Sequence, residues 1–430
     1  MISYLLNYSF FKEKFWSSLQ SKFKDIKPQN IKFKLYSGES FPERANDNSS
    51  ESTEIIINDK EGLAALFWND ELTVSEAYIN NHLSINGNIL DVLSVRHHLN
   101  PEKSTTESLY QLFLFKLPSF ITPEMRSNWL KEHYTGTGDL INEFTEGALY
   151  SHGLFKEGFD SLNDGSLRKI KKSFESCDLK PGQNVLIFGG WGIDILYLSE
   201  MGINVTMITL SPNQKEHVDK LLEQNNFNHS ECLLIDFYDL PDEKKYDAVL
   251  NYGVTEHLPD YEKLFRKYEK ILKKDGYVWS DFCAMDQPTS RFIKKYIFPG
   301  KAECVNISSF IKIGIDNKFE LLQLTNDCQD YYLTCKKWAE NLENMKNEVI
   351  EKYGLKTFRI FQLYLWGCVH EFESKSSPLT AYHTVFKKEQ VSTRSFEEEQ
   401  ASLDCQQEAS ENLIRDEEQL QAQIVVPSKK

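Results

Sequence analysis

Short apolar runs recur after residue 183 and alternate with longer amphipathic stretches. The apolar runs predict buried strands at residues 184–188, 204–210, 232–235, 246–253, 276–283, 319–324 and 382–388. The amphipathic stretches predict helices at residues 212–225, 261–273 and 331–353. This alternation is typical of an α/β fold with a doubly wound, mostly parallel, Rossmann-like sheet of seven strands. Such a sheet carries its functional site at the carboxyl ends of its first strands.

The residues before this region predict a second, smaller α/β domain. Residues 31–41 and 54–59 predict two short strands, and residues 60–69 predict a helix. Residues 101–106 are typical of a linker. We therefore expect four parts. Residues 1–105 hold a basic N-terminal helix and a small α/β domain, and residues 106–180 hold a linker and a helical cap over the active site. Residues 181–388 form a large α/β domain with a helical lid at about 285–370, and residues 389–430 form an acidic, disordered tail.

The first 25 residues predict an amphipathic helix, because Phe11, Phe15, Leu19 and Phe23 recur at a four-residue spacing beside lysines. Two interpretations remain open. The helix either packs its apolar stripe on its own domain, or lies in a membrane interface with its lysines toward anionic headgroups and Trp16 in the acyl boundary. Residues 1–35 carry seven lysines against two acidic residues, which suits the second interpretation.

Composition narrows the classes of protein to consider. The chain has 430 residues and a net charge of −15, which argues against general nucleic-acid binding. Its eight cysteines form no CxxC pair and no zinc spacing, so we expect no metal site and reduced thiols. No apolar run approaches the ~20 residues that span a bilayer, and the N-terminus lacks the order of a signal peptide. We expect a cytoplasmic protein, peripheral at the membrane if the second interpretation of the N-terminal helix holds.

A glycine turn follows the first strand of the large domain. Gly189, Gly190 and Gly192 allow the backbone to approach a ligand, and the next helix presents free N–H groups. The strand before the turn ends in Ile187 and Phe188, and we expect no carboxylate near the turn to meet an ammonium group or hydroxyls. A turn of this kind also serves packing alone, so it is weak as a single signal.

Polar residues at the ends of the next strands strengthen the interpretation as a cofactor pocket. Thr209, Ser211 and Gln214 are suited to a ribose, while Asp236 and Phe237 are suited to an adenine amino group and ring face. The fourth strand leads to Glu256 and His257 at the rim of the same crevice. We expect His257 to bond locally and position its loop.

Several motifs in order resemble the cyclopropane-fatty-acyl-phospholipid synthase family. They are "HYTGTGDLINEF", "LYSHGLFKEGFDSL", "LKPGQNVLIFGGWG", "VTMITLSPNQ", "EHLPDYEKLFRKYEKILKKDG", "FIKKYIFPG", "DYYLTCKKWAEN" and "FRIFQLYLWG". The likeness runs from about residue 30 to about 387, and "NDELTVSEAYINNHLSINGNILDVL" resembles the family's small lipid-carrier-like domain. The resemblance implies S-adenosylmethionine as cofactor, with Tyr150 and Ser151 among the residues that bind it.

The resemblance also implies a reaction: methyl transfer to the double bond of an unsaturated acyl chain. A poor nucleophile of this kind must be held close to the methyl donor and away from water. The resulting cation needs negative charge or aromatic faces, for which Glu256, Tyr252 and Tyr331 are suitable. A base then removes a proton, and family members hold a bicarbonate for that step.

The chain departs from the family at two places. The acid that ends the family's first strand is absent, which predicts a weaker hold on the methionine portion. In the bicarbonate pocket Glu256 and Tyr331 are retained, whereas His152, Asp281 and Cys283 replace a cysteine, a histidine and an isoleucine. His152 and Asp281 are candidate acid/base groups, and His152 could accept the proton and make bicarbonate unnecessary. The alternatives are a surface or capping histidine and a strand-end aspartate that bonds neighbouring N–H groups.

Three functions remain open from the sequence. The first is a cyclopropane synthase or lipid C-methyltransferase, with an unsaturated acyl lipid or a membrane surface as partner. The second keeps the cofactor and methylates an amine or a small apolar metabolite. The third is a degenerate family member that binds lipid or a protein without catalysis. The sequence permits a homodimer and predicts no nucleic-acid partner.

Overall fold

The computed structural model describes residues 12–13, 17, 31–41, 52–68, 70–99, 137–156, 160–299 and 302–389. The described residues up to Lys388 belong to one compact unit. Of the predicted N-terminal helix only Lys12, Glu13 and Ser17 are described, and all three are helical. The rest of that helix, the linker at 101–106 and the tail beyond residue 389 lie outside the described residues. Within those residues, no helix has both the length and the apolar character that crossing a bilayer requires.

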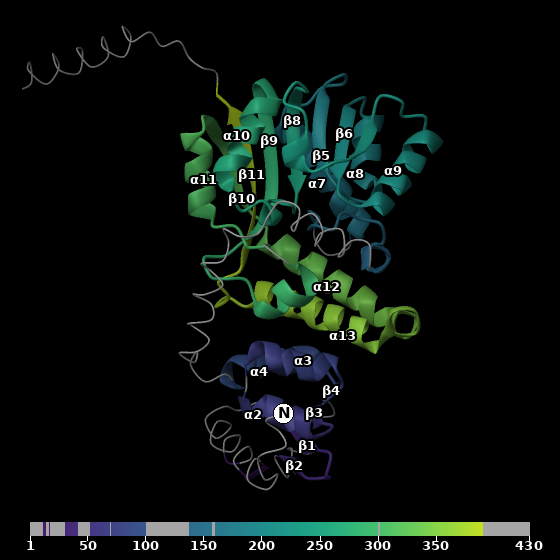
Figure 1. Cartoon of the computed structure of the whole chain (residues 1–430), viewed down its shortest axis with the longest axis vertical. Helices are drawn as coiled ribbons and strands as arrows, with labels where there is room; N and C mark the ends of the chain where they lie inside the picture. Colours follow the sequence, from purple (N-terminus) through teal and green to yellow (C-terminus); the bar gives the residue numbers. More distant parts are fainter. Residues whose placement is uncertain are drawn as a thin grey trace, which may run out of the picture. The chain divides into compact units, whose positions relative to one another are not determined.

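The large domain is built on a seven-stranded sheet with the strand order β10-β11-β9-β8-β5-β6-β7 (Figure 1). Strand β11 runs antiparallel to both of its neighbours, and the other strand pairs are parallel. The strands are β5 (Asn184–Phe188), β6 (Asn204–Thr209), β7 (Glu231–Leu234), β8 (Tyr246–Tyr252), β9 (Leu272–Ala284), β10 (Phe319–Asn326) and β11 (Thr380–Lys388). The mostly parallel sheet predicted from the sequence is confirmed.

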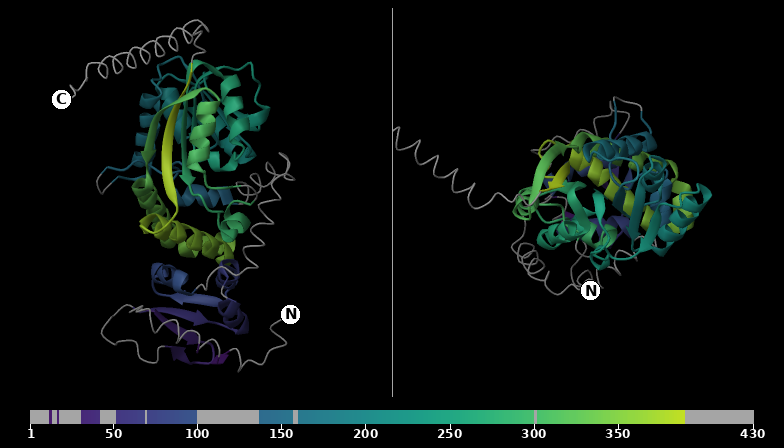
Figure 2. Two further views of the ribbon diagram at one scale, coloured as in Figure 1. Left: turned by 90° about the vertical axis from the view of Figure 1, so that its left-hand side faces the viewer. Right: turned by 90° about the horizontal axis from the view of Figure 1, so that it is seen from above.

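Helices cover both faces of this sheet (Figures 1 and 2). Successive strand residues point to opposite faces, so Val185 and Ile187 of β5 pack with α7, α8 and α9, while Leu186 and Phe188 pack with α10 and α11. The helices are α7 (Leu162–Ser176), α8 (Ile193–Glu200), α9 (Pro212–Gln224), α10 (Tyr261–Ile271) and α11 (Ile307–Asp316). Burial on both faces explains why the strands are nearly continuous apolar runs.

The region predicted as one helix at 331–353 contains two. Helix α12 (Cys328–Asn344) ends at Met345, and α13 (Lys346–Glu373) continues to the last strand. Neither glycine nor proline marks this boundary, so the apolar pattern alone did not reveal it. Gly354 interrupts α13 with φ 86°, a conformation that glycine adopts without steric cost. The helix predicted at 261–273 ends two residues earlier, where β9 begins.

In its described part, the small domain has a four-stranded sheet of order β2-β1-β3-β4 and the helices α2, α3 and α4. Its apolar core includes Phe33, Ile57 and Leu83, and Ile360 and Leu363 of α13 pack against it. The elements are β1 (Ile31–Leu35), β2 (Ser40–Phe41), β3 (Thr53–Ile57), α2 (Lys60–Trp68), α3 (Glu71–Ile79), β4 (Leu83–Asn86) and α4 (Ile89–Leu99). Helix α13 thus joins the core of the small domain to the large one.

A buried arginine reinforces this junction. Arg359 of α13 donates hydrogen bonds to the backbone carbonyls of Tyr78 and Leu83 and, at 3.2 Å, to the hydroxyl of Ser84. Its guanidinium also lies 4.7 Å from the centre of the Tyr78 ring. Hydrogen bonds from a charged donor are stronger than neutral ones, so losing these bonds weakens the junction.

We expect Arg359→Leu to loosen the small domain. Losing these bonds should lower the opening free energy of β4 by about 2 kcal/mol, so that its backbone amides exchange roughly thirtyfold faster. Hydrogen exchange read by mass spectrometry measures this change. Lys356→Leu on the exposed side of the same helix is the matched control. Equal exchange in both variants would contradict the role given to Arg359.

Candidate functional site

A cavity of about 1110 Å³ lies at the carboxyl ends of β5, β6 and β8. Most of the residues predicted to bind cofactor or act in catalysis line it together. They are Tyr150, Ser151, Gly189, Gly190, Thr209, Gln214, Asp236, Phe237, Glu256 and Tyr331. Four other predicted residues, Gly192, Ser211, His152 and Asp281, are outside the lining that the described residues form.

Gly192 and Ser211 shape the cavity through the helices that they begin. Gly192 is the N-cap of α8 with φ 105°, and a Cβ there would lie 2.5 Å from a methyl carbon of Leu221. Ser211 is the N-cap of α9, where its hydroxyl accepts a hydrogen bond from the Gln214 N–H. Their predicted role in binding cofactor is therefore indirect in this geometry.

The turn and the next strand ends form a polar cradle. Gly189 and Gly190 have φ of 48° and 122°, and a Cβ on Gly189 would lie 3.4 Å from the Gln214 side-chain oxygen. Thr209 donates its hydroxyl hydrogen to that oxygen at 2.6 Å. Asp236 accepts a hydrogen bond from the Tyr238 N–H, which fixes its carboxylate at the end of the third strand. Positive φ at the turn and close neighbours keep side chains out of the cradle.

The prediction that no carboxylate lies near the glycine turn is wrong. Asp194, in the first turn of α8, lines the cavity and is 1% exposed. A Cβ on Gly190 would lie 3.7 Å from each of its carboxylate oxygens. Burial raises the pKa of Asp194 to about 7. Asp194 was not predicted as a site residue because it lies in the first turn of the next helix rather than at the end of the strand.

Glu256 follows β8 in a short 3₁₀ turn, η4 (Thr255–His257), and faces the cavity that it lines. One carboxylate oxygen accepts a hydrogen bond of 2.7 Å from the Cys283 N–H. The other is buried and has no hydrogen-bond partner among the described residues. Burial, with a smaller contribution from the nearby Asp281, raises the pKa of Glu256 to about 7. A carboxyl group of this kind can hold or release a proton near neutral pH.

Tyr331 of α12 adds an aromatic face to the same cavity. Its ring stacks on Phe372 of α13 with 4.8 Å between centroids and lies 4.9 Å from the His152 ring. Burial, followed by the neighbouring Cys283 and Glu256, raises the pKa of the Tyr331 hydroxyl well above its usual value. The hydroxyl therefore stays protonated and neutral.

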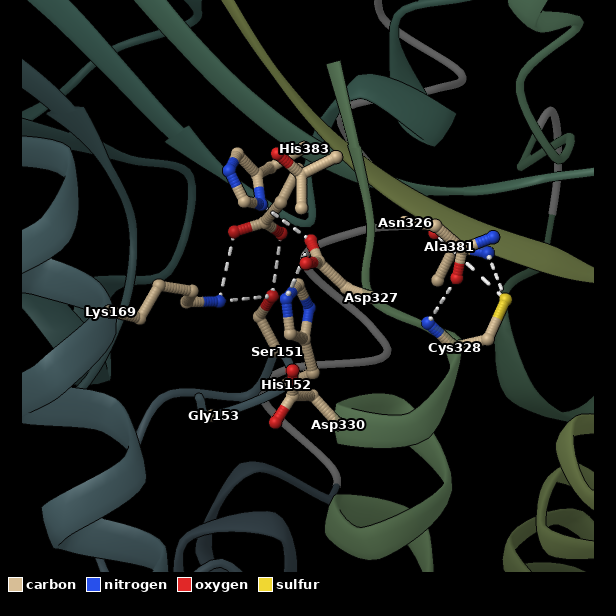
Figure 3. A network of polar contacts seen from close by, with 12 residues as sticks. Ser151, His152, Gly153, Lys169, Asn326, Asp327, Cys328, Asp330, Ala381 and His383 are labelled. Carbon is tan, nitrogen blue, oxygen red and sulfur yellow. Dashed lines mark hydrogen bonds and ion pairs between the residues drawn. The ribbon is translucent and has the colours of Figure 1, made fainter. Parts of the chain in front are cut away.

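Asp281 lies behind the cavity wall in a buried ion pair. Its carboxylate is 2.8 Å from the Lys169 ammonium and accepts a 2.7 Å hydrogen bond from the Ser151 hydroxyl. Lys169 also donates to the Ser151 hydroxyl at 2.8 Å, which closes a three-membered network (Figure 3). Both charged side chains are fully buried, so each depends on the other for compensation. Lys169 was not singled out from the sequence.

His152 belongs to a second buried network. Its Nε2 lies 3.2 Å from a carboxylate oxygen of Asp327, and the Nδ1 of His383 lies 2.7 Å from the same oxygen (Figure 3). Burial alone would raise the pKa of Asp327, but hydrogen bonds to the two histidines outweigh it and lower the pKa to about 2. His152 is thus a core residue paired with a carboxylate, and direct proton acceptance by it stays a prediction.

Apolar side chains from three parts of the chain complete the cavity. Helices α12 and α13 contribute Trp338, Leu363, Tyr364 and Phe372, and the segment between β9 and α11 contributes Phe292 and Phe298. The small domain contributes Ile55, Leu66, Val74, Tyr78, Leu83, Ile85, Ile89, Val92 and Leu93. A mostly apolar cavity with a few convergent polar groups suits a ligand with a long apolar part.

Comparison with known proteins agrees with this geometry. The sequence profile of the family described as mycolic acid cyclopropane synthetase matches residues 123–382. The sphingolipid C9-methyltransferase of Candida albicans is 27% identical over 343 residues, which cover 74% of this chain and 66% of that protein. The cyclopropane-fatty-acyl-phospholipid synthase of Escherichia coli is 27% identical over 266 residues, covering 60% of this chain and 67% of that protein. The chain therefore spans about two thirds of the length of these relatives.

Solved structures show the same fold. The cyclopropane synthase MmaA2 from Mycobacterium tuberculosis aligns with a TM-score of 0.56 and 23% identity, covering 63% of this chain and all of that chain. The mycolic acid cyclopropane synthase CmaA1, solved with S-adenosylhomocysteine and CTAB, aligns with a TM-score of 0.55 and 22% identity. That alignment covers 61% of this chain and 98% of the other.

Proposed function

Because this chain belongs to the mycolic acid cyclopropane synthetase family of S-adenosylmethionine-dependent methyltransferases, we propose that it transfers a methyl or methylene group to the double bond of an unsaturated acyl chain. The observation that carries this proposal is one cavity whose lining includes the residues of the cofactor cradle, a long apolar wall and Glu256. The relatives that act on lipids by name support a lipid acceptor.

The residues of the cradle fit S-adenosylmethionine. The turn at Gly189 and Gly190 leaves room for close backbone approach, and Asp236 and Phe237 offer an acid and a ring face. Asp194 has one carboxylate oxygen with no hydrogen-bond partner in the described part of the chain. When bound, this cofactor supplies an electrophilic methyl group on its sulfonium. The chain's own part is to hold the acceptor against that group and exclude water, because apolar and aromatic side chains dominate the opposite wall.

The cavity is also suited to a positively charged acceptor carbon. Glu256 supplies negative charge, and the faces of Tyr331 and Trp338 supply π-electrons. Burial raises the pKa of the Cys283 thiol well above its usual value, so this thiol stays protonated and does not present a thiolate that would trap the cation. We propose that Glu256 accepts the proton that the acceptor then loses, because it lines the cavity with a carboxylate oxygen that has no hydrogen-bond partner among the described residues.

The altered bicarbonate pocket fits this role for Glu256. Asp281 is already paired with the ammonium of Lys169, and His152 is already paired with the carboxylate of Asp327. We therefore propose that His152 and Asp281 position the wall around Ser151 and Tyr331, and that added bicarbonate is not required. The proposals of a bilayer contact through the N-terminal helix and of a cytoplasmic, peripheral location remain predictions, since most of that helix lies outside the described residues.

Expression in a bacterial host that has unsaturated lipids and lacks such an enzyme tests the acceptor class. We expect lipids whose mass has grown by one CH₂ group on the acyl chain. Mild chemical hydrogenation then separates a product that keeps a double bond beside a methyl or methylene branch from a cyclopropane ring. A mass increase of one CH₂ group found only in amine-containing metabolites would favour the N-methyltransferase alternative and overturn the lipid proposal.

A further inference from the structure

Asp194 has a buried carboxylate whose two oxygens differ in their hydrogen bonding. One oxygen accepts a 2.9 Å hydrogen bond from the Ile195 N–H, and the other has no hydrogen-bond partner among the described residues. The side chain lies directly behind the glycine turn, at the wall of the cavity. Burying a charged oxygen without a partner is unfavourable, so such a group calls for an explanation.

The nearest cation does not supply the missing partner. Lys169 interacts with Asp194 electrostatically, but its ammonium is within hydrogen-bond distance of Ser151 and Asp281, both at 2.8 Å. Asp194 therefore retains capacity for one further donor. A bound ligand can supply that donor, because Asp194 lines the cavity beside the glycine turn at Gly190.

We propose that Asp194 accepts the ammonium group of the cofactor's methionine portion, in place of the acid that this chain lacks at the end of β5. The charge of Lys169, which acts on Asp194 electrostatically, is compensated by Asp281, so Asp194 is left to pair with a ligand cation. This inference rests on the proposed function only through its cofactor, not through the acceptor.

A different role would be structural, with Asp194 serving only to balance the charge of Lys169. The two roles predict different binding affinities when the ligand, rather than the protein, is changed. An analogue of S-adenosylhomocysteine whose amino group is replaced by hydrogen lacks only the group that Asp194 is proposed to bind. A structural role for Asp194 affects both ligands equally.

Calorimetric titration of the full chain with both ligands tests the proposal. We expect the unaltered protein to bind S-adenosylhomocysteine about ten- to a hundredfold more tightly than the deaminated analogue. Asp194→Asn should bind the two with similar affinity, close to that of the unaltered protein for the analogue. Asp219→Asn, which removes an exposed carboxylate of α9, should keep the full discrimination.

Each outcome decides the matter. Equal losses for both ligands in Asp194→Asn, or discrimination that survives the substitution, would overturn the role of Asp194. If Asp194→Asn does not fold, the unaltered protein still tests the proposal. Equal affinities of the unaltered protein for the two ligands would also overturn it. If the unaltered protein binds neither ligand, the proposed function fails together with this inference.

Discussion

Glu256→Gln should lower the rate of methyl transfer about a thousandfold, within the range that a positioned acid/base group contributes. Glutamine keeps the shape of the side chain and can still accept the hydrogen bond from the Cys283 N–H. It cannot take up a proton or carry negative charge toward the acceptor. Binding of S-adenosylhomocysteine should change less than about threefold, so that the loss lies in the chemical step. Radiolabelled methyl transfer with saturating cofactor measures the rate.

The pH dependence gives an independent check on Glu256. Because burial raises its pKa to about 7, the carboxylate form that accepts a proton is scarce below pH 7 and predominates above it. The rate should therefore rise with pH through a midpoint near 7, and the Gln variant should lack that rise. Glu340→Gln, at an exposed position of the helix that carries Tyr331, is the control and should retain both rate and profile. A Gln variant with at least a tenth of the original rate would remove Glu256 from the mechanism.

Gly190→Asp should abolish measurable cofactor binding. The position has φ 122°, which side chains other than glycine rarely adopt, and the new Cβ would lie 3.7 Å from the Asp194 carboxylate. A second acid there adds like-charge repulsion and fills the space of the cradle. We expect affinity for S-adenosylhomocysteine to fall at least about a hundredfold by calorimetry, which corresponds to roughly 3 kcal/mol.

Gly182→Asp provides the matched comparison for this substitution. Gly182 also has positive φ, at 86°, but a Cβ there would meet nothing within 4 Å. It precedes β5, away from the lining of the cavity. This variant should share the backbone strain and keep cofactor affinity. If both variants bound the cofactor like the unaltered protein, the glycine turn would not be part of the site.

The sheet could be predicted because its strands are buried on both faces. Each strand therefore appears in the sequence as a run of apolar residues between turn residues. The cradle could be predicted for a related reason: parallel strands bring residues at their carboxyl ends together, so Thr209, Asp236 and Glu256 converge although they are far apart in sequence. The break at Met345 could not be predicted, since no glycine or proline marks it.

The pairing of buried charged residues inside the large domain could not be predicted from the sequence. The sequence singled out His152 and Asp281 as candidate acid/base groups, but their partners Asp327 and Lys169 come from distant elements whose approach depends on packing. Asp194 was missed because a carboxylate in the first turn of a helix ordinarily serves the helix dipole. Its buried, unpartnered oxygen is visible only once the turn and the neighbouring strands are in place.

The most direct test of the central claim is transfer of a labelled methyl group by the purified full-length protein. Vesicles of an unsaturated phospholipid and of its saturated counterpart with the same headgroup would be incubated with methyl-labelled S-adenosylmethionine. The account predicts label in the acyl chains of the unsaturated lipid and none in the saturated one. Equal labelling of both, or label on the headgroup, would show that the double bond is not the acceptor and would contradict the proposed function.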